Sequence, residues 1–164
     1  MLLRMVSDKR HWESAADYPW LPADKGPAAI LKDQYLDSAS ALSVYEIPSG
    51  DAALVKRVVV AFAAGGQHRD KRDYVLFEND IAEDVGLRIV PTLGHTADAT
   101  ANTLHRDLVQ VTCSQVGALF DLAYRRGQIG RVDSWDVERG ISDGIMAGYI
   151  NKNAIHKDWL KRLG

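Results

Sequence analysis

The sequence predicts an α/β fold, with a small three-stranded, mostly parallel sheet, flanking helices and a helical C-terminal layer. Short runs rich in β-branched and aromatic residues occur at 41–47, 73–77 and 87–92. A segment of helical periodicity follows each of the first two runs, and this alternation is typical of parallel sheets. From residue 97 onward only helical patterns follow, which predicts the helical layer.

The composition is that of one folded domain. The chain has 164 residues, of which 46% are hydrophobic and 26% are charged, and globular proteins have this balance. We divide it into an irregular arm (1–40), a sheet-forming region (41–96) and a helical region (97–164). The net charge of -2 gives no general electrostatic reason to bind nucleic acid or anionic lipid.

The arm is expected to be extended rather than helical. Pro19 and Pro22 lie among the aromatic residues Trp12, Tyr18 and Trp20, and prolines this close remove the amide donors that a helix needs. The aromatic side chains either pack on their own domain or contact a partner, and the sequence leaves both interpretations open.

The sheet-forming region begins with a strand at 41–47, which ends at the turn sequence PSGD. A helix is expected over 51–65, because Val55, Val58 and Phe62 recur at helical spacing despite two of them being β-branched. An aspartate stands at its start and a glycine at its end, and both are common caps there.

A helix of barely two turns, in DIAEDVG, connects the second strand, 73–77, to the third, 87–92. This link is shorter than the roughly 10 to 12 residues of a usual parallel crossover. We expect these two strands to be parallel neighbours, although the short link leaves their direction open.

The helical region opens with a long helical pattern from Thr96 to about residue 126. Leu104, Leu108 and Val111 belong to its apolar stripe, and Gly117 or the segment VQVTCSQV could divide it in two. The stretch RRGQIGRVD is expected to be a turn. Two further helices are expected over 134–147 and 154–163.

The helix at 134–147 has an unusual strip of glycines, Gly140, Gly144 and Gly148, at every fourth position. Gly148 can be a C-terminal cap, but each interior glycine costs about 1 kcal/mol relative to alanine. A bare strip lets another backbone approach closely, so we expect a second helix to cross here. The long helix, with small residues at 117–118, is the expected partner within the chain, and a symmetry mate in a homo-oligomer is the alternative.

Targeting and redox signals favour a cytoplasmic location. Cys113 is the one cysteine, so neither an intrachain disulfide nor a multi-cysteine zinc site can form. Charged residues interrupt the first ten positions, which leaves no apolar stretch for a signal peptide. The longest apolar run, 58–64, is far shorter than the roughly 20 residues of a membrane span, so no membrane partner is expected.

A cluster of carboxylates and histidines follows the predicted strands. If the strands are parallel, the loops after them meet at one edge of the sheet. These loops hold Glu78, Asp80, His95 and Asp98, and His105 lies behind them. Such a set could hold a divalent metal and activate water, as hydrolases do.

The same residues have a structural interpretation, which we favour. Asp51, Asp80 and Thr96 stand where helices are expected to begin, and these residue types are preferred helix caps. Glu78 and Asp98 would favour the positive helix ends nearby. Whether the chain is an enzyme stays open, and outside the hydrolase hypothesis no cofactor is expected.

The first functional hypothesis is a non-catalytic protein that binds a protein partner, as an immunity protein, an antitoxin-like protein or an accessory regulatory subunit. Trp12, Tyr18 and Trp20 would be its contact residues. It rests on the absence of the usual nucleophile-elbow, zinc-helix, dinucleotide and P-loop motifs. The alternative is the metal-assisted hydrolase. A nucleic-acid binder comes third, because acidic residues are interleaved with the basic residues of the C-terminal helices.

Overall fold

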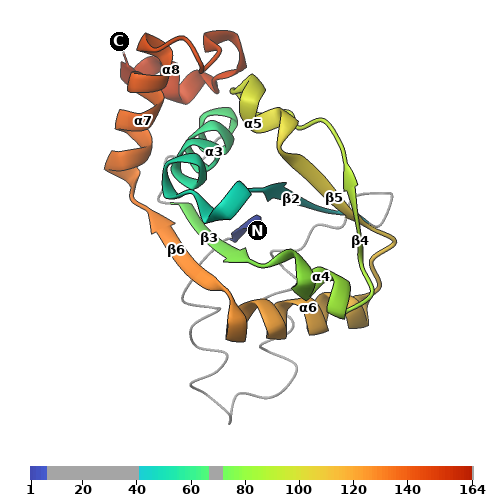
Figure 1. The fold of residues 1–164 in the computed structure, drawn as a ribbon. Helices are drawn as coiled ribbons and strands as arrows, with labels where there is room; N and C mark the ends of the chain where they lie inside the picture. The colour runs from blue at the N-terminus through green and yellow to red at the C-terminus, as the bar shows by residue number, and fades with distance from the viewer. Residues whose placement is uncertain (7–40, 67–71, 164) are drawn as a thin grey trace.

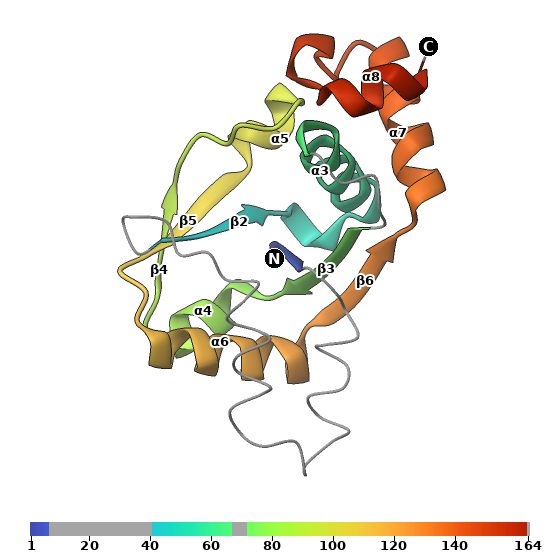
Figure 2. The same ribbon diagram turned by 180° about the vertical axis from the view of Figure 1, so that it is seen from behind.

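The computed structural model describes residues 1–6, 41–66 and 72–163. Its centre is a six-stranded antiparallel sheet with the strand order β4-β5-β2-β1-β3-β6. Helices cover both faces of the sheet (Figure 1 and, from behind, Figure 2). The strands are β1 (Leu2–Val6), β2 (Leu42–Glu46), β3 (Arg72–Phe77), β4 (Arg88–Pro91), β5 (His105–Val109) and β6 (Gln128–Val132).

The helices fall into two layers, one on each face. They are α3 (Ala52–Gly65), α4 (Asn79–Asp84), α5 (Ala99–Thr103), α6 (Cys113–Arg126), α7 (Ser134–Met146) and α8 (Lys157–Leu163). Short 3-10 helices occur at Pro48–Gly50 and Lys152–Ala154. Over the described ranges, no helix has both the length and the apolar character needed to cross a bilayer.

The prediction of a three-stranded, mostly parallel sheet is wrong. The strands predicted at 41–47, 73–77 and 87–92 exist as β2, β3 and β4, but β1 lies between β2 and β3, and β5 lies between β2 and β4. Each inserted strand is antiparallel to both of its neighbours. The three predicted strands therefore point the same way, and their carboxyl ends reach one edge, without being paired to each other.

The region 97–164 is also not purely helical. The strand β5 divides the predicted long helix into α5 and α6, and the predicted turn RRGQIGRVD contains β6. Both strands exist because they pair with distant strands, β5 with β2 and β4, and β6 with β3. The helices expected at 134–147 and 154–163 are present as α7 and, in a shorter form, α8.

Two hydrophobic cores lie on opposite faces of the sheet, because successive side chains of a strand point to opposite sides. Leu2 and Phe77 point into one core, which α4 and α6 close. Leu3 and Leu76 point into the other, which α3, α7 and α8 close. Trp159 of α8 is the largest fully buried side chain of the described residues and belongs to this second core.

The glycine strip of α7 packs within the chain, as predicted, but not against the long helix: Gly140 packs against α3, and Gly144 packs against the segment that follows α7. A Cβ added at Gly140 would lie 2.7 Å from Cγ2 of Val60 in α3. A Cβ at Gly144 would lie 2.7 Å from Cδ1 of Ile150. Gly148 ends the helix with a φ of 77°, as expected for a C-terminal cap. Gly140 therefore allows two helices to pack closely, and Gly144 allows the segment after α7 to pack on that helix.

Replacing Gly144 with leucine should lower the free energy of unfolding by about 1 to 3 kcal/mol, because the buried site has no room for the side chain. The matched control is Gly117→Leu in α6, where an added Cβ meets nothing within 4 Å. That variant should be stabilised by up to about 1 kcal/mol through helix propensity. Equal unfolding curves in urea for the two variants would contradict the packing described here.

Candidate functional site

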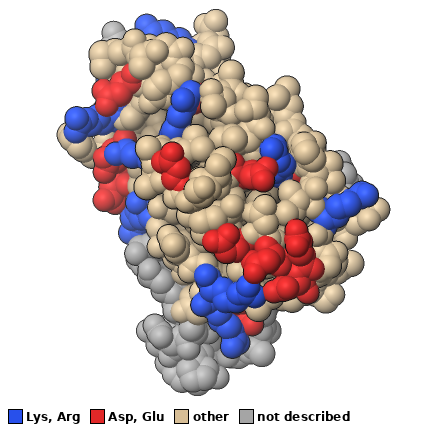
Figure 3. Space-filling model, in the orientation of Figure 1, with Lys and Arg blue, Asp and Glu red and all other residues tan. Residues whose placement is uncertain are grey.

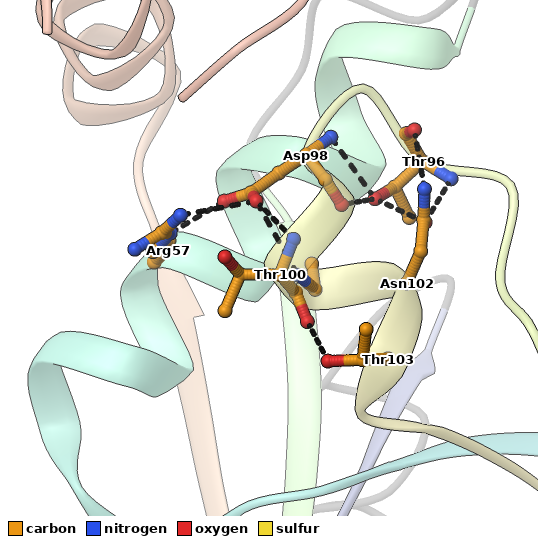
Figure 4. Close-up of polar contacts among 7 residues, drawn as sticks. Arg57, Thr96, Asp98, Thr100, Asn102 and Thr103 are labelled. Atoms are coloured by element: carbon orange, nitrogen blue, oxygen red, sulfur yellow. Dashed lines mark hydrogen bonds and ion pairs between the residues drawn. The ribbon is translucent and has the colours of Figure 1, made fainter. Parts of the chain in front are cut away.

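Asp98 lies at the centre of a polar network that joins α3, α5 and the loop before α5 (Figure 4). It is the N-cap of α5, and its carboxylate accepts hydrogen bonds from the backbone amides of Thr100 (2.7 Å) and Ala101 (3.4 Å). The same carboxylate forms a two-point ion pair with Arg57 of α3, with Nη2 3.0 Å from Oδ1. Asp98 is only 1% exposed, so its charge is balanced within the protein.

Arg57 holds this loop against the segment that follows α7. Its guanidinium lies 4.4 Å from the ring centroid of Tyr149, and the hydrogen bond to Asp98 raises the pKa of Arg57 above its ordinary value. The backbone amide of Asn151 donates to the carbonyl of Ala97 over 2.8 Å. Three segments distant in sequence therefore meet at one partly buried ion pair.

Asn102 fixes the loop from its other side (Figure 4). Its Oδ1 accepts from the backbone amide (2.6 Å) and the hydroxyl (2.8 Å) of Thr96, and its Nδ2 donates to the Thr96 carbonyl. Gly94 has no room for a side chain, since an added Cβ would lie 3.1 Å from both Asn102 Oδ1 and His105 Cβ. The side chain of Asn102 is therefore occupied in shaping the loop.

His105 lies in β5, not on the helix predicted from its spacing. Its Nδ1 is 2.7 Å from the hydroxyl of Thr92, and its ring makes an edge contact with Tyr45 at 5.2 Å. Burial, above all, lowers the pKa of His105, and the nearby His95 acts in the same direction. Burial also raises the pKa of Tyr45 to about 12. Burial therefore favours the neutral form of both side chains.

The structure does not bring the predicted acidic and histidine residues into one site. Glu78 and Asp80 belong to the α4 layer, where a carboxylate oxygen of Asp80 lies 2.8 Å from Nη2 of Arg126 in α6. Asp98 lies with α3 on the opposite face of the sheet. Across the part of the chain that is described, no three histidine, cysteine or acidic residues are grouped so that they could hold a metal ion.

The helix-cap interpretation is confirmed in part. Asp51 caps α3, with its carboxylate 2.8 Å from the backbone amide of Ala53. At α5 the cap is Asp98, not Thr96. α4 begins after Glu78, which makes no side-chain capping bond, and Asp80 lies in the first turn. Asp51 and, of the candidate carboxylates, Asp98 thus cap helix ends.

The arginines of the C-terminal region are paired with acidic groups. Acidic and basic side chains are interspersed on the surface shown in Figure 3, without a large area of one sign. This arrangement leaves little net field to attract a nucleic acid. The pairs are Arg125–Asp121, Arg126–Asp80, Arg126–Asp84, Arg131–Asp73, Arg139–Asp143 and Arg162–Glu138.

An exposed apolar surface on α7 was not anticipated from the sequence. Trp135 is 67% exposed and Met146 is 76% exposed. At about 100° per residue, these two side chains and Arg139 lie on one side of α7, opposite the buried Ile141 and Gly144. The guanidinium of Arg139 lies 5.3 Å from the ring centroid of Trp135. We call Trp135, Arg139 and Met146 the outer α7 face.

The spacing of the outer α7 face was visible in the sequence, since its members lie on the side of the helix away from the glycine strip. The contact residues that were predicted, Trp12, Tyr18 and Trp20, lie outside the described residues.

Comparison of the chain with models of known protein families, with curated proteins and with solved structures found no match.

Proposed function

We propose that this protein acts by binding a protein partner, and that the outer α7 face is its contact surface. The exposure of Trp135 and Met146 on one side of one helix is the observation that supports this most directly. Tryptophan, methionine and arginine are enriched at protein interfaces, and large aromatic and arginine side chains contribute most of the binding energy. The outer α7 face combines all three residue types.

The helix that carries this face is held firmly from behind, which lowers the entropic cost of binding. Gly140 packs against Val60 of α3. On the flanks, Asp136 forms an ion pair with Lys56 at 2.6 Å, and Glu138 pairs with Arg162 of α8. The exposed side chains therefore project from a helix whose position is fixed by the core.

Such a protein would act as an immunity protein, an antitoxin-like protein or an accessory regulatory subunit, and we propose the cytoplasm as its location because its one cysteine suits a reducing compartment. Trp12, Tyr18 and Trp20 remain proposed as additional contacts. No observation on the described residues favours the metal-assisted hydrolase or the nucleic-acid binder over this function.

Replacing Trp135 with alanine should weaken partner binding by about thirtyfold, the effect of a hot-spot side chain worth about 2 kcal/mol. The immobilised protein is used to isolate partners from a lysate of its native cells, and each purified partner is then titrated against the variants. Leu93→Ala is the matched control, because Leu93 is equally exposed, at 68%, on a different surface. Equal affinities of the two variants would contradict the proposed contact surface.

A further inference from the structure

We propose that the partner of the outer α7 face is a second copy of this chain, with the two α7 helices packed antiparallel about a twofold axis. This inference rests on the proposed function, since it names the partner of the same surface. It is carried by the order of the exposed residues along α7, which makes the face complementary to itself.

In a twofold antiparallel pair, each contact occurs twice, so residues that face each other must lie at equal distances from the axis. Trp135 and Met146 lie at equal distances from the point midway between residues 140 and 141, and the midpoint of Arg139 and Asp143 lies half a position from it. An axis through this point places Trp135 of one copy against Met146 of the other. It also places the arginine against the aspartate, again twice.

Both contacts are chemically favourable. A methionine sulfur and an aromatic ring attract each other when they are in contact. Arg139 and Asp143 are 3.7 Å apart within one chain, and their side chains are 62% and 54% exposed. An exposed pair of this kind contributes little to the monomer, so both groups are free to exchange partners across the axis.

The charges beside the outer α7 face also permit self-association. With this axis, Glu138 of one copy lies level with Asp143 of the other along the helices, but at about 100° per residue the two carboxylates lie on opposite flanks of the contact. Glu138 is already neutralised by Arg162, at 3.1 Å, and Asp136 by Lys56, at 2.6 Å. The remaining charged groups along the axis, Arg139 and Asp143, are of opposite sign.

The expected dimer is weak. α7 has 13 residues and is therefore roughly 20 Å long. A single pair of such helices buries less than the roughly 1,200 Å² of a stable interface. We therefore expect a dimer that dissociates on dilution through the micromolar range, rather than a permanent one.

Sedimentation equilibrium of the full chain over this concentration range tests the proposal. The native chain should show a reversible monomer–dimer equilibrium, and Trp135→Ala and Met146→Ala should each raise the Kd of the dimer by about tenfold or more. Leu93→Ala should leave the Kd unchanged. A chain that is monomeric at all concentrations, or a dimer that Trp135→Ala does not weaken, overturns the proposal.

Charge reversal tests the twofold arrangement itself. Arg139→Glu and Asp143→Arg should each weaken the dimer, and the double variant should restore it, because the exchanged charges again face each other across the axis. No restoration overturns the antiparallel register. If the chain is monomeric while Trp135→Ala still weakens binding to a different protein, the proposed function stands and the second copy is excluded as the partner.

Discussion

Replacing Arg57 with methionine is expected to lower the free energy of unfolding by about 2 to 4 kcal/mol, somewhat less than for a fully buried ion pair, because the side chain of Arg57 is 31% exposed. Asp98 is 1% exposed, so in the variant its carboxylate keeps two backbone donors but loses its counter-ion. Urea unfolding at pH 7 measures this loss.

The matched control for Arg57 is its neighbour Lys56, which also forms an ion pair from α3. The Lys56–Asp136 pair lies on the surface, with side chains 51% and 41% exposed. Lys56→Met should therefore cost less than about 1 kcal/mol. Similar losses for the two methionine variants would show that the buried pair contributes no more than a surface pair.

Replacing Trp159 with alanine is expected to cost about 3 to 5 kcal/mol, because it leaves a large cavity in the core beneath α3. The ring is 0% exposed, and its Nε1 donates to the carbonyl of Ala63 over 3.1 Å. Trp159→Phe keeps most of the apolar volume but loses this hydrogen bond, so about 1 kcal/mol should be lost. Thermal and urea unfolding of both variants give the comparison.

Trp135 provides the control for Trp159. Its side chain is 67% exposed, so Trp135→Ala should change the stability of the monomer by no more than about 0.5 kcal/mol. A large loss of stability in this variant would show that Trp135 belongs to the core, and its exposure could then not support a contact surface.

The elements that were predicted correctly are determined by residues that lie close together in the sequence. α3 has apolar residues at helical spacing and the cap Asp51, whose bonds reach only two and three residues along the chain. α7 has an amphipathic pattern with glycines at every fourth position. This spacing was enough to predict that other groups pack closely against Gly140 and Gly144. Local signals did not identify the packing partner, because the side chain of Val60 meets Gly140 only in the folded chain.

The strands that were missed depend on distant pairing. Leu104, Leu108 and Val111 recur at helical spacing, yet β5 is extended because β2 and β4 pair with it on both sides. β6 contains Gly130, a residue that weakens strand propensity, and the ring of Tyr74 on β3 fills the space where a Cβ would lie, at 2.2 Å. Short segments of this kind become strands only when the rest of the sheet exists.

The separation of the candidate site residues has a related cause. Asp98 was recognised as a polar residue near a helix start, but its counter-ion Arg57 lies 41 positions away, and the sequence has no periodicity that links them. The loops after β3 and β4 do lie at the same end of the sheet, where both strands have their carboxyl ends. α4 and α5 then turn to opposite faces, so Asp80 and Asp98 never meet.

The place of β1 in the middle of the sheet sets the order of events during synthesis. β1, β2 and β3 are neighbours and end by Phe77, so the ribosome releases the three middle strands before any outer one. β5 can join β2 only after Val109 has emerged, and β6 can join β3 only after Val132. Until then both edges of the nascent sheet present unpaired amides and carbonyls, the form in which growing chains aggregate or require chaperones. Co-translational folding therefore proceeds from the middle of the sheet outward.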